Sequence, residues 1–360
     1  MNYSGNILTK KRLNLEVREP LGLLVKSIIL LVSVLFGLSI SIFILILSGV
    51  NASDLWNEFI IYIFTSQKNL SAVLVQAVPL IIVGLSAAVA FRAKFWNIGI
   101  EGQMIFGAIA ATFIATNDVG PESMRLTLMF LAAAAGGIGW IILPAIIKIR
   151  LDVNEIISTL LMNYIAFNFL LHLLYGSWRD PLTGFPNSQQ YDTFENLPLI
   201  GWQSLNFSIV IALFLTAVIL WLFVFSRFGY MLRVLHSNAN MAQSLGIRVG
   251  ILIFLATIIS GALAGICGFA VSAGIESRMT QSFFVGYGFS GILIAFLARE
   301  NPIGILIVSL LFSILVIGGQ SLQVFYQIPF AMVQLIQAII VMCVAGSEFF
   351  IRYRFSILKR

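Results

Sequence analysis

The sequence SRFGYMLRVLHSNANMAQSLGIRVG, residues 226–250, is a basic and polar stretch between two long apolar blocks. Three arginines lie within it, at Arg227, Arg233 and Arg248. Lys and Arg are enriched in the loops on the cytoplasmic side of membrane proteins. If the flanking blocks cross a membrane, this stretch is therefore a cytoplasmic loop.

The centre of this loop, Ser237–Leu245, favours a short helix. It contains good helix formers and starts with Ser and Asn, which are common at helix N-termini. We expect Ser237 or Asn238 to cap a helix at the membrane surface. Ala239, Ala242 and Leu245 would then offer small apolar contacts to a partner outside the bilayer. The alternative is an ordinary solvated connector.

The composition excludes a soluble domain, because 59% of residues are hydrophobic, 10% are charged and the mean hydropathy is +1.00. The net charge of +6 could suggest nucleic acid. However, the basic residues lie in loops between apolar spans, so membrane topology explains them better. Cys267 and Cys343 both lie inside apolar runs and indicate neither a disulfide framework nor a zinc site.

Apolar runs of about 20 residues, the length that crosses a bilayer as a helix, recur along the chain. The sequence predicts an all-α membrane protein with about ten such spans: 27–48, 70–91, 98–116, 126–147, 156–175, 207–225, 251–273, 283–298, 302–319 and 328–347. The 283–298 run is short and Gly-rich, and a re-entrant segment is its alternative reading.

Threading these spans alternately across a membrane places all but four of the 21 Lys and Arg residues on the cytoplasmic side. The four external ones are Lys68, Arg125, Arg179 and Arg278. Both termini are then cytoplasmic, including an N-terminal segment at 1–26, and 176–206 is the main external loop. We expect residues 1–360 to form a single transmembrane domain.

The two apolar blocks, 70–175 and 251–347, suggest an internal duplication. Each contains about four spans, and the number of crossings between them gives opposite orientations. Gly84–Ala88 and Ser260–Ala264 are weakly alike in sequence. Inverted repeats are common in transporters, where the substrate pathway lies between the two halves.

Sequence motifs for enzyme chemistry are absent. No G-x-x-x-x-G-K-[ST] phosphate loop occurs, and none of the seven lysines follows a glycine. The two histidines, His172 and His236, are far apart, and no cluster of metal ligands is visible. We therefore expect no catalytic residue, no metal site and no cofactor bound by this chain.

Polar residues inside apolar spans mark either function or helix–helix contact. The candidates for a substrate pathway are Asn97, Glu101, Gln103, Thr159, Asn163, Gln334 and Gln337. Glu101 is the one carboxylate that could lie well inside a span. Its alternative reading is a structural carboxylate held by Arg92, Lys94 or a polar group of another helix. The other candidates can equally be interhelical contacts, and Gly261 and Gly265 form a small-xxx-small packing pair.

At this point a family resemblance appears. FRAKFWNIGIEGQ (91–103), followed by NEIISTLLMNYIA (154–166), resembles the permease of bacterial nucleoside ABC importers served by basic-membrane-protein-type lipoproteins. That group lies within the ribose/branched-chain amino-acid permease family, and the resemblance covers about 70–345. Further matching positions are Gly229, Arg233, Gly246, Ile247, Ser260–Gly265, Gly286–Phe289 and Asn301–Gly304. The family's loop pattern often includes a proline that 237–242 lacks, which leaves the loop's detailed shape open.

The resemblance implies a fold like that of type II importers and one coupling helix that contacts a separate ATPase. On this chain that helix falls on the predicted one: Ser237, Asn238, Ala239, Asn240, Met241, Ala242, Gln243, Ser244 and Leu245. ATP and Mg²⁺ would be bound by the ATPase, and a substrate-binding lipoprotein would dock on the external face. A second homologous permease, in a heterodimer or a homodimer, would complete the pathway in the lipid of the cell membrane.

The resemblance makes nucleosides the expected cargo, with sugars or branched-chain amino acids as alternatives. A secondary transporter driven by protons or sodium is a different class. It would need an ionisable relay within the membrane, for which Glu101 is the only candidate.

Overall fold

The computed structural model describes residues 12–18, 22–57, 61–283 and 286–358, which form two compact units. Unit 1 combines the two ends of the chain, up to Asn57 and from Gly319 onwards, and unit 2 comprises Glu58–Gly318. The boundary falls within one long helix, α13. Parts of the predicted N-terminal segment and of the 283–298 span lie outside the described residues.

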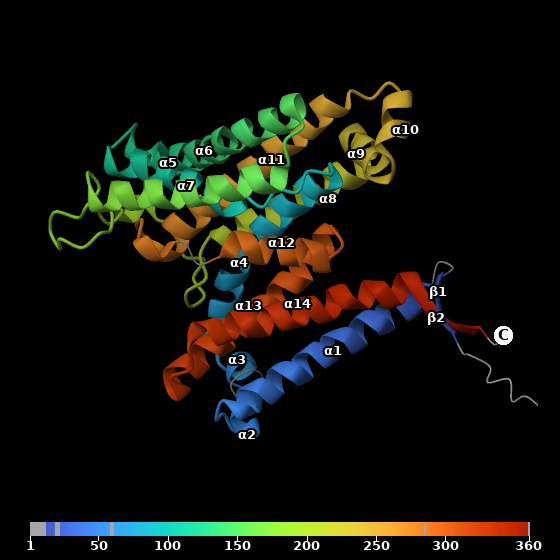
Figure 1. Cartoon of the computed structure of the whole chain (residues 1–360). Helices are drawn as coiled ribbons and strands as arrows, with labels where there is room; N and C mark the ends of the chain where they lie inside the picture. Colours follow the sequence, from blue (N-terminus) through green and yellow to red (C-terminus); the bar gives the residue numbers. More distant parts are fainter. Residues whose placement is uncertain (1–11, 19–21, 58–60, 284–285, 359–360) are drawn as a thin grey trace, which may run out of the picture. The chain divides into compact units, whose positions relative to one another are not determined.

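Unit 2 contains the helices that carry the candidate sites (Figure 1). Their bounds are α3 Tyr62–Thr65, α4 Gln67–Arg92, α5 Ile100–Thr116, α6 Glu122–Leu151, α7 Glu155–Tyr175, α8 Ser208–Phe225, α9 Arg227–Ser237, α10 Ala239–Ser244, α11 Val249–Val271, α12 Tyr287–Leu297 and the first part of α13 Pro302–Tyr326. A π-helical turn, Ser272–Glu276, continues α11. In Figure 1, α9 and α10 lie at one end of this unit and the 176–206 loop lies at the other.

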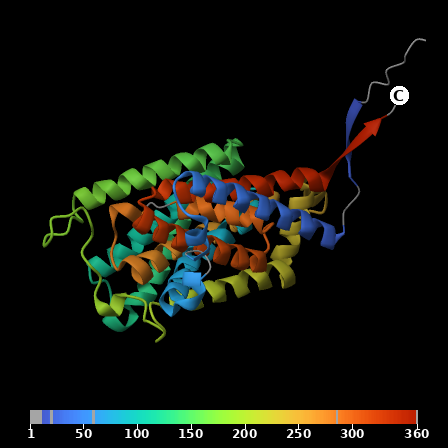
Figure 2. The same cartoon turned by 90° about the horizontal axis from the view of Figure 1, so that it is seen from below.

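Unit 1 is built on α1 (Leu23–Leu47) and α14 (Phe330–Arg352), which pack along each other, with α2 (Ala52–Trp56) following α1. At Gly37 an added Cβ would lie 3.0 Å from the backbone of Ile340, so glycine permits close packing there. Two strands, β1 (Arg12–Val17) and β2 (Tyr353–Leu358), form an antiparallel ribbon beyond these helices (Figure 2). This ribbon departs from the predicted all-helical fold, although the alternating sequence RLNLEV is typical of a strand.

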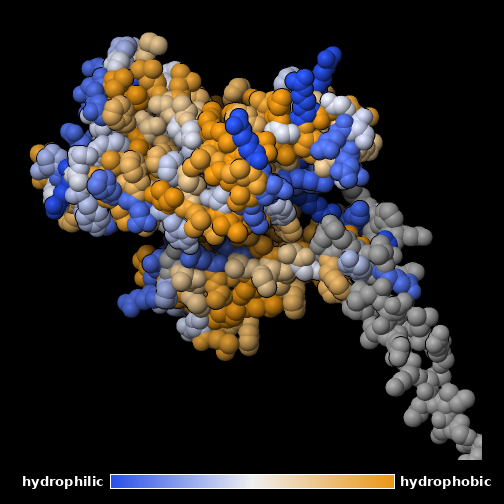
Figure 3. Space-filling view, turned by 45° about the horizontal axis from the view of Figure 1, so that its top comes forward, coloured by the Kyte–Doolittle hydropathy of each residue, from blue (hydrophilic) through white to orange (hydrophobic). Residues whose placement is uncertain are grey.

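The predicted spans correspond to helices of the structure. Eight described helices are long and apolar enough to cross a membrane, and two further apolar helices, α5 and α12, are shorter. Hydrophobic side chains cover much of the helical surface seen in Figure 3. With 11 residues, α12 is about 16 Å long, roughly half the hydrocarbon thickness of a bilayer. It is therefore too short to cross the membrane alone.

The core of unit 2 depends on glycines that let α5, α6 and α11 approach closely. An added Cβ on Gly265 would lie 2.0 Å from the carbonyl oxygen of Ala133 on α6. One on Gly107 of α5 would lie 2.3 Å from the Cα of Gly265. Gly261 likewise meets Gly137 of α6. The predicted packing role of Gly261 and Gly265 is confirmed.

The two weakly similar segments predicted as repeat counterparts are in contact. The hydroxyl groups of Ser86 on α4 and Ser260 on α11 lie 3.0 Å apart, and α11 runs antiparallel to α4 there, with Cys267 beside Pro79. In each block the next α-helix is a short one, α5 or α12, and a break in the α-helical structure precedes it. Opposite direction and matching order are what inverted repeats predict.

Candidate functional site

The predicted surface helix is present and has defined ends. The side chain of Asn238 caps α10 by accepting hydrogen bonds from the amides of Asn240 (2.9 Å) and Met241 (3.2 Å). At its other end Gly246 has φ +78°, and the amide of Ile247 donates to the carbonyl of Ala242 at 3.1 Å. This pattern is a Schellman ending, in which glycine is the residue best suited to a positive φ. Asn238, rather than Ser237, is thus the cap.

The exposed side of α10 matches the prediction for Leu245 but not for the two alanines. Ala242 is completely buried and Ala239 is half-buried, whereas Met241 and Leu245 are 54% and 58% exposed. The expectation that Ala242 faces a partner is therefore wrong, because α10 turns this residue towards the neighbouring helices α9 and α11. Met241 and Leu245, one turn apart, form the apolar surface that α10 offers outward.

A charged cluster lies at the same end of unit 2. The Glu300 carboxylate, between α12 and α13, lies 3.8 Å from Arg92 at the end of α4 and 3.9 Å from His236 on α9. The Arg92 guanidinium also donates to the Glu300 carbonyl and stacks over the Phe223 ring at 3.7 Å. Burial raises the pKa of Glu300, whereas His236 and Arg92 oppose that shift. The cluster thus joins α4, α8 and α9 to the α12–α13 connection, beside the start of α10.

Asn97 and Gln103 lie in a buried polar network at the start of α5. Their side-chain amides exchange two hydrogen bonds, at 3.1 and 2.9 Å, and Asn97 also donates to the Ser260 hydroxyl at 3.0 Å. Asn97 is fully buried and Gln103 is 1% exposed. Non-helical backbone inside a membrane must have its polar groups bonded within the protein. The Asn97 side-chain oxygen meets part of that need by accepting from the Gly99 amide at 3.1 Å.

Thr159 and Asn163 hold the same segment from α7. The Thr159 hydroxyl accepts from the amide of Ile98 at 3.2 Å, and Asn163 donates to the Ile98 carbonyl at 2.8 Å. The Asn163 side-chain oxygen also accepts from the amide of Gly102 at 2.8 Å. The two residues therefore share one face of α7, as the sequence predicts, and that face packs against the start of α5.

Glu101 is fully buried and caps a different helix from its own. Its carboxylate accepts hydrogen bonds from the amides of Gly286, at 3.0 Å, and Gly288, at the N-terminus of α12. The expected pairing with Arg92 or Lys94 is wrong, because Arg92 binds Glu300 instead. The third predicted partner of Glu101, a polar group of another helix, is the one observed. A carboxylate at a helix N-terminus is stabilised by the free amides and by the helix dipole.

Five of the seven pathway candidates are thus brought together around the start of α5: Asn97, Glu101, Gln103, Thr159 and Asn163. All five are almost completely buried, and their polar groups bond to one another or to backbone. This geometry favours interhelical contact over substrate contact. Gln334 and Gln337 belong to α14 in unit 1, where Gln334 is exposed and Gln337 is 7% exposed.

The 176–206 loop is held by an ion pair that sequence inspection missed. Arg125, 3% exposed, lies 3.0 Å from Glu195 and 2.7 Å from Asp118. Burial raises the pKa of Glu195, with the Arg125 guanidinium opposing. The separation of 70 residues between Arg125 and Glu195 gives no local signal in the sequence. Within the 176–206 loop, Asp192 starts a capped 3₁₀ turn.

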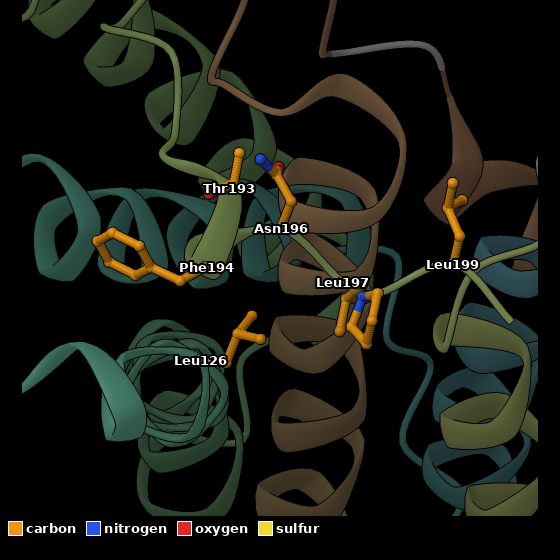
Figure 4. Close-up of a pocket in the computed structure, with 7 residues that line it drawn as sticks. Leu126, Thr193, Phe194, Asn196, Leu197 and Leu199 are labelled. Atoms are coloured by element: carbon orange, nitrogen blue, oxygen red, sulfur yellow. The ribbon is translucent and has the colours of Figure 1, made fainter.

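Next to this ion pair is an open pocket of about 420 Å³ (Figure 4). It is lined mainly by apolar side chains: Leu126 of α6 and, from the loop, Thr193, Phe194, Asn196, Leu197, Pro198 and Leu199. The loop therefore presents an apolar depression at the end of unit 2 opposite α10. In the described part of the chain, no three His, Cys, Asp or Glu side chains gather as metal ligands.

Eight long apolar helices and two short ones at matching positions of opposed repeats, all within the described residues, are the features of a multi-pass membrane transporter. Residues 69–345 match the family described as the permease component of the branched-chain amino acid transport system. The chain belongs to this family and is an ABC transporter permease, a transport subunit and not an enzyme.

Two relatives match over nearly their whole length. The glucose ABC transporter permease protein of Haloferax volcanii is 34% identical over 90% of this chain and 88% of its own. The guanosine ABC transporter permease protein of Bacillus subtilis is 32% identical over 92% of this chain and 96% of its own. A solved ABC transporter in an inward-facing conformation shares the fold, with a TM-score of 0.51, 18% identity and coverage of 90% of this chain and 98% of its own.

Proposed function

We propose that this chain is the membrane subunit of an ATP-driven importer that moves nucleosides into the cell. The observation that carries the proposal is the similarity to the guanosine permease of Bacillus subtilis, which extends over 92% of this chain. The motifs at 91–103 and 154–166, which carry the resemblance to nucleoside permeases, build the buried network around the start of α5.

A sugar is the second candidate cargo, because the glucose permease of Haloferax volcanii is as similar in identity and coverage. Branched-chain amino acids, named in the family description, are a third. Competition for uptake distinguishes the three candidate cargoes. The complete importer is expressed in a strain that lacks its own transporters for these compounds, and uptake of labelled guanosine or uridine is measured. Excess nucleoside should abolish uptake of the label, whereas excess ribose, glucose or leucine should not. Uptake of labelled glucose but not of guanosine would contradict the nucleoside proposal.

The partner on the cytoplasmic side would be a separate ATPase that binds ATP and Mg²⁺. We place its contact on α10, at residues 237–245, with Met241 and Leu245 inserted into the partner surface. Two observations support this: both side chains are more than half exposed, and α10 is fixed by caps at both ends. A helix whose ends are capped does not fray, so it can pass a movement of the ATPase to the rest of the permease.

The remaining parts of the assembly follow from this orientation. Both termini and α10 would lie in the cytoplasm, and the 176–206 loop would face outward in the cell membrane. A substrate-binding lipoprotein would dock on that loop, where Leu199 and Ile200 are 65% and 47% exposed. A second homologous permease, in a heterodimer or homodimer, would form the other wall of the pathway.

The transport cycle would use the two ends of unit 2 in turn. ATP binding would close the ATPases, displace α10 and rock the helices between outward and inward access. A proton-coupled mechanism would instead require Glu101 to exchange protons. Its carboxylate binds two backbone amides, which is a structural use. Uptake into proteoliposomes with internal ATP and no ion gradient tests the ATP-driven mechanism, and uptake on a pH gradient alone would contradict it.

A further inference from the structure

The outward face of α7 carries polar side chains inside a predicted membrane span. Tyr164 is 59% exposed, and Asn168 and His172 follow at intervals of one helical turn, both exposed. Leu161, 56% exposed, lies on the same face. The buried residues Thr159 and Asn163 lie on the opposite face, so the exposed polar residues stand at the centre of the free surface.

The rotation of α7 is fixed, so this face cannot turn inward. Thr159 and Asn163 bond to the segment before α5, and the indole of Trp140 on α6 donates to the Met162 carbonyl at 3.3 Å. The ring of Phe169 stacks on Phe106 of α5, with centroids 5.3 Å apart. These contacts lie on the side of α7 away from the exposed polar residues and extend from Thr159 to Phe169.

Helix α8 gives an internal comparison. Its exposed residues are apolar throughout, namely Val210, Leu213, Phe214, Ala217, Val218, Trp221, Val224 and Phe225. Its polar residues, Ser208 and Thr216, are buried. This is the pattern of a helix that faces lipid. In α7 the exposed face is mixed: Tyr164, Asn168 and His172 lie among the exposed apolar residues Ile157, Leu161, Ile165 and Phe169.

Tyr164 and Asn168 lie too far along α7 to be at the membrane surface. In a helix of 21 residues, Tyr164 lies about 14 Å and Asn168 about 20 Å from the cytoplasmic end. The amide of Asn168 donates to the Tyr164 carbonyl at 2.8 Å, which uses one of its four hydrogen-bonding positions. Polar side chains at such depth are costly in lipid and mark pathways through the protein.

We propose that the exposed stripe of α7, Tyr164, Asn168 and His172, lines the water-filled pathway and contacts the nucleoside during transport. The inference deepens the proposed function and rests on it. A tyrosine ring offers a face on which a base can stack, and an asparagine amide and an imidazole offer donors and acceptors. Spaced one turn apart, the three side chains give a nucleoside successive contacts over about 12 Å of helix.

The test measures access of water and of substrate to single cysteines in the complete transporter. The background carries Cys343→Ala, because Cys343 is partly exposed, whereas Cys267 is buried. Asn168→Cys and Leu161→Cys probe the stripe, and Leu161→Cys leaves its polar side chains intact. The matched control is Phe214→Cys on the lipid-type face of α8. It lies six residues from the outer end of its helix, as Asn168 lies seven residues from the outer end of α7.

A charged, water-soluble thiol reagent should label both α7 variants at least about tenfold faster than Phe214→Cys, because thiolate formation needs water. Saturating guanosine, delivered with the binding protein, should slow labelling of the α7 variants several-fold. Equal, slow labelling of Asn168→Cys and Phe214→Cys would overturn the proposal and indicate a dry surface against lipid or a partner helix. Fast labelling that is insensitive to guanosine, in a transporter that imports it, would also overturn it. If glucose protects and guanosine is neither imported nor protective, the nucleoside function fails while the pathway assignment stands.

Discussion

Replacing Glu101 should loosen α12 at its first turn without unfolding the rest of unit 2. The carboxylate is fully buried and accepts two hydrogen bonds, from the amides of Gly286 and Gly288. Glu101→Ala leaves both donors without an acceptor. A buried donor without a partner costs about 1–3 kcal/mol, so the two together cost about 2–6 kcal/mol. Glu101→Gln keeps one acceptor oxygen and turns an NH₂ group towards the other amide, which costs about 1–3 kcal/mol.

Hydrogen exchange of the purified complex measures this effect locally. A cost of about 1–3 kcal/mol accelerates exchange by about 5- to 150-fold where the amide exchanges through local opening. We expect that acceleration in peptides covering 286–297 for Glu101→Gln, and a larger one for Glu101→Ala. Peptides from α6 should be unchanged. Glu122→Gln, the same substitution at an exposed position of α6, is the matched control and should leave both regions as in the unmodified protein.

Unchanged exchange at 286–297 in Glu101→Ala would refute the capping role. The transport assay adds a separate criterion. Because the contacts of Glu101 are structural, Glu101→Gln should retain ATP-driven uptake in proteoliposomes without an ion gradient. If the unmodified protein transports on a pH gradient alone and the variant does not, the carboxylate carries protons and the ATP-driven mechanism is wrong.

Three further results are expected. Met241→Glu should reduce ATP-driven uptake at normal expression by placing a charge on the exposed tip of α10, and normal uptake would argue against a coupling contact there. Gly265→Ala should lower the free energy of unfolding by about 1–3 kcal/mol, because the added methyl group overpacks against the α6 backbone. Gly139→Ala, whose added methyl group meets open space, should not. Thermal denaturation of the two variants compares them. A hydrogen bond from the Thr183 hydroxyl lowers the pKa of Asp180, so the ionised form stabilises the 176–206 loop. That stability should be present above the usual value of 3.8 and lost as the pH falls through the lowered pKa, and limited proteolysis of Asp180→Asn should lack this pH dependence.

The features that the sequence predicts well are those with a local physical cause. Span positions follow from runs of apolar residues, and α10 follows from helix formers behind a capping Asn238 and before Gly246. Contact partners are a different matter. Arg92 and Lys94 are nearest to Glu101 in sequence, yet its partners lie 185 and 187 residues away. Backbone amides carry no signature in a sequence, so this capping interaction could not be read from it.

The same limit explains the orientation of α10. In Ser237–Leu245 every third or fourth residue is apolar, which predicts an amphipathic helix but leaves two apolar sets, Ala239 with Ala242 and Met241 with Leu245. The choice between them depends on α9 and α11, which pack against one side. Alanine is small enough for the close side, and the longer side chains remain exposed. A sequence-based choice of Ala242 as the outward residue therefore fails for a steric reason.

Helix α12 connects the candidate sites at the two depths of unit 2. Its first turn is bound by Glu101, next to the buried network at the start of α5, and Glu300 follows its last turn. The Glu300 carboxylate faces His236 of α9, two residues before Asn238 caps α10. If ATP hydrolysis displaces α10, we expect the His236–Glu300 contact to pass that movement to α12, an 11-residue helix about 16 Å long. This is a short mechanical route between the proposed ATPase contact and the level of the membrane at which α5 and α12 begin.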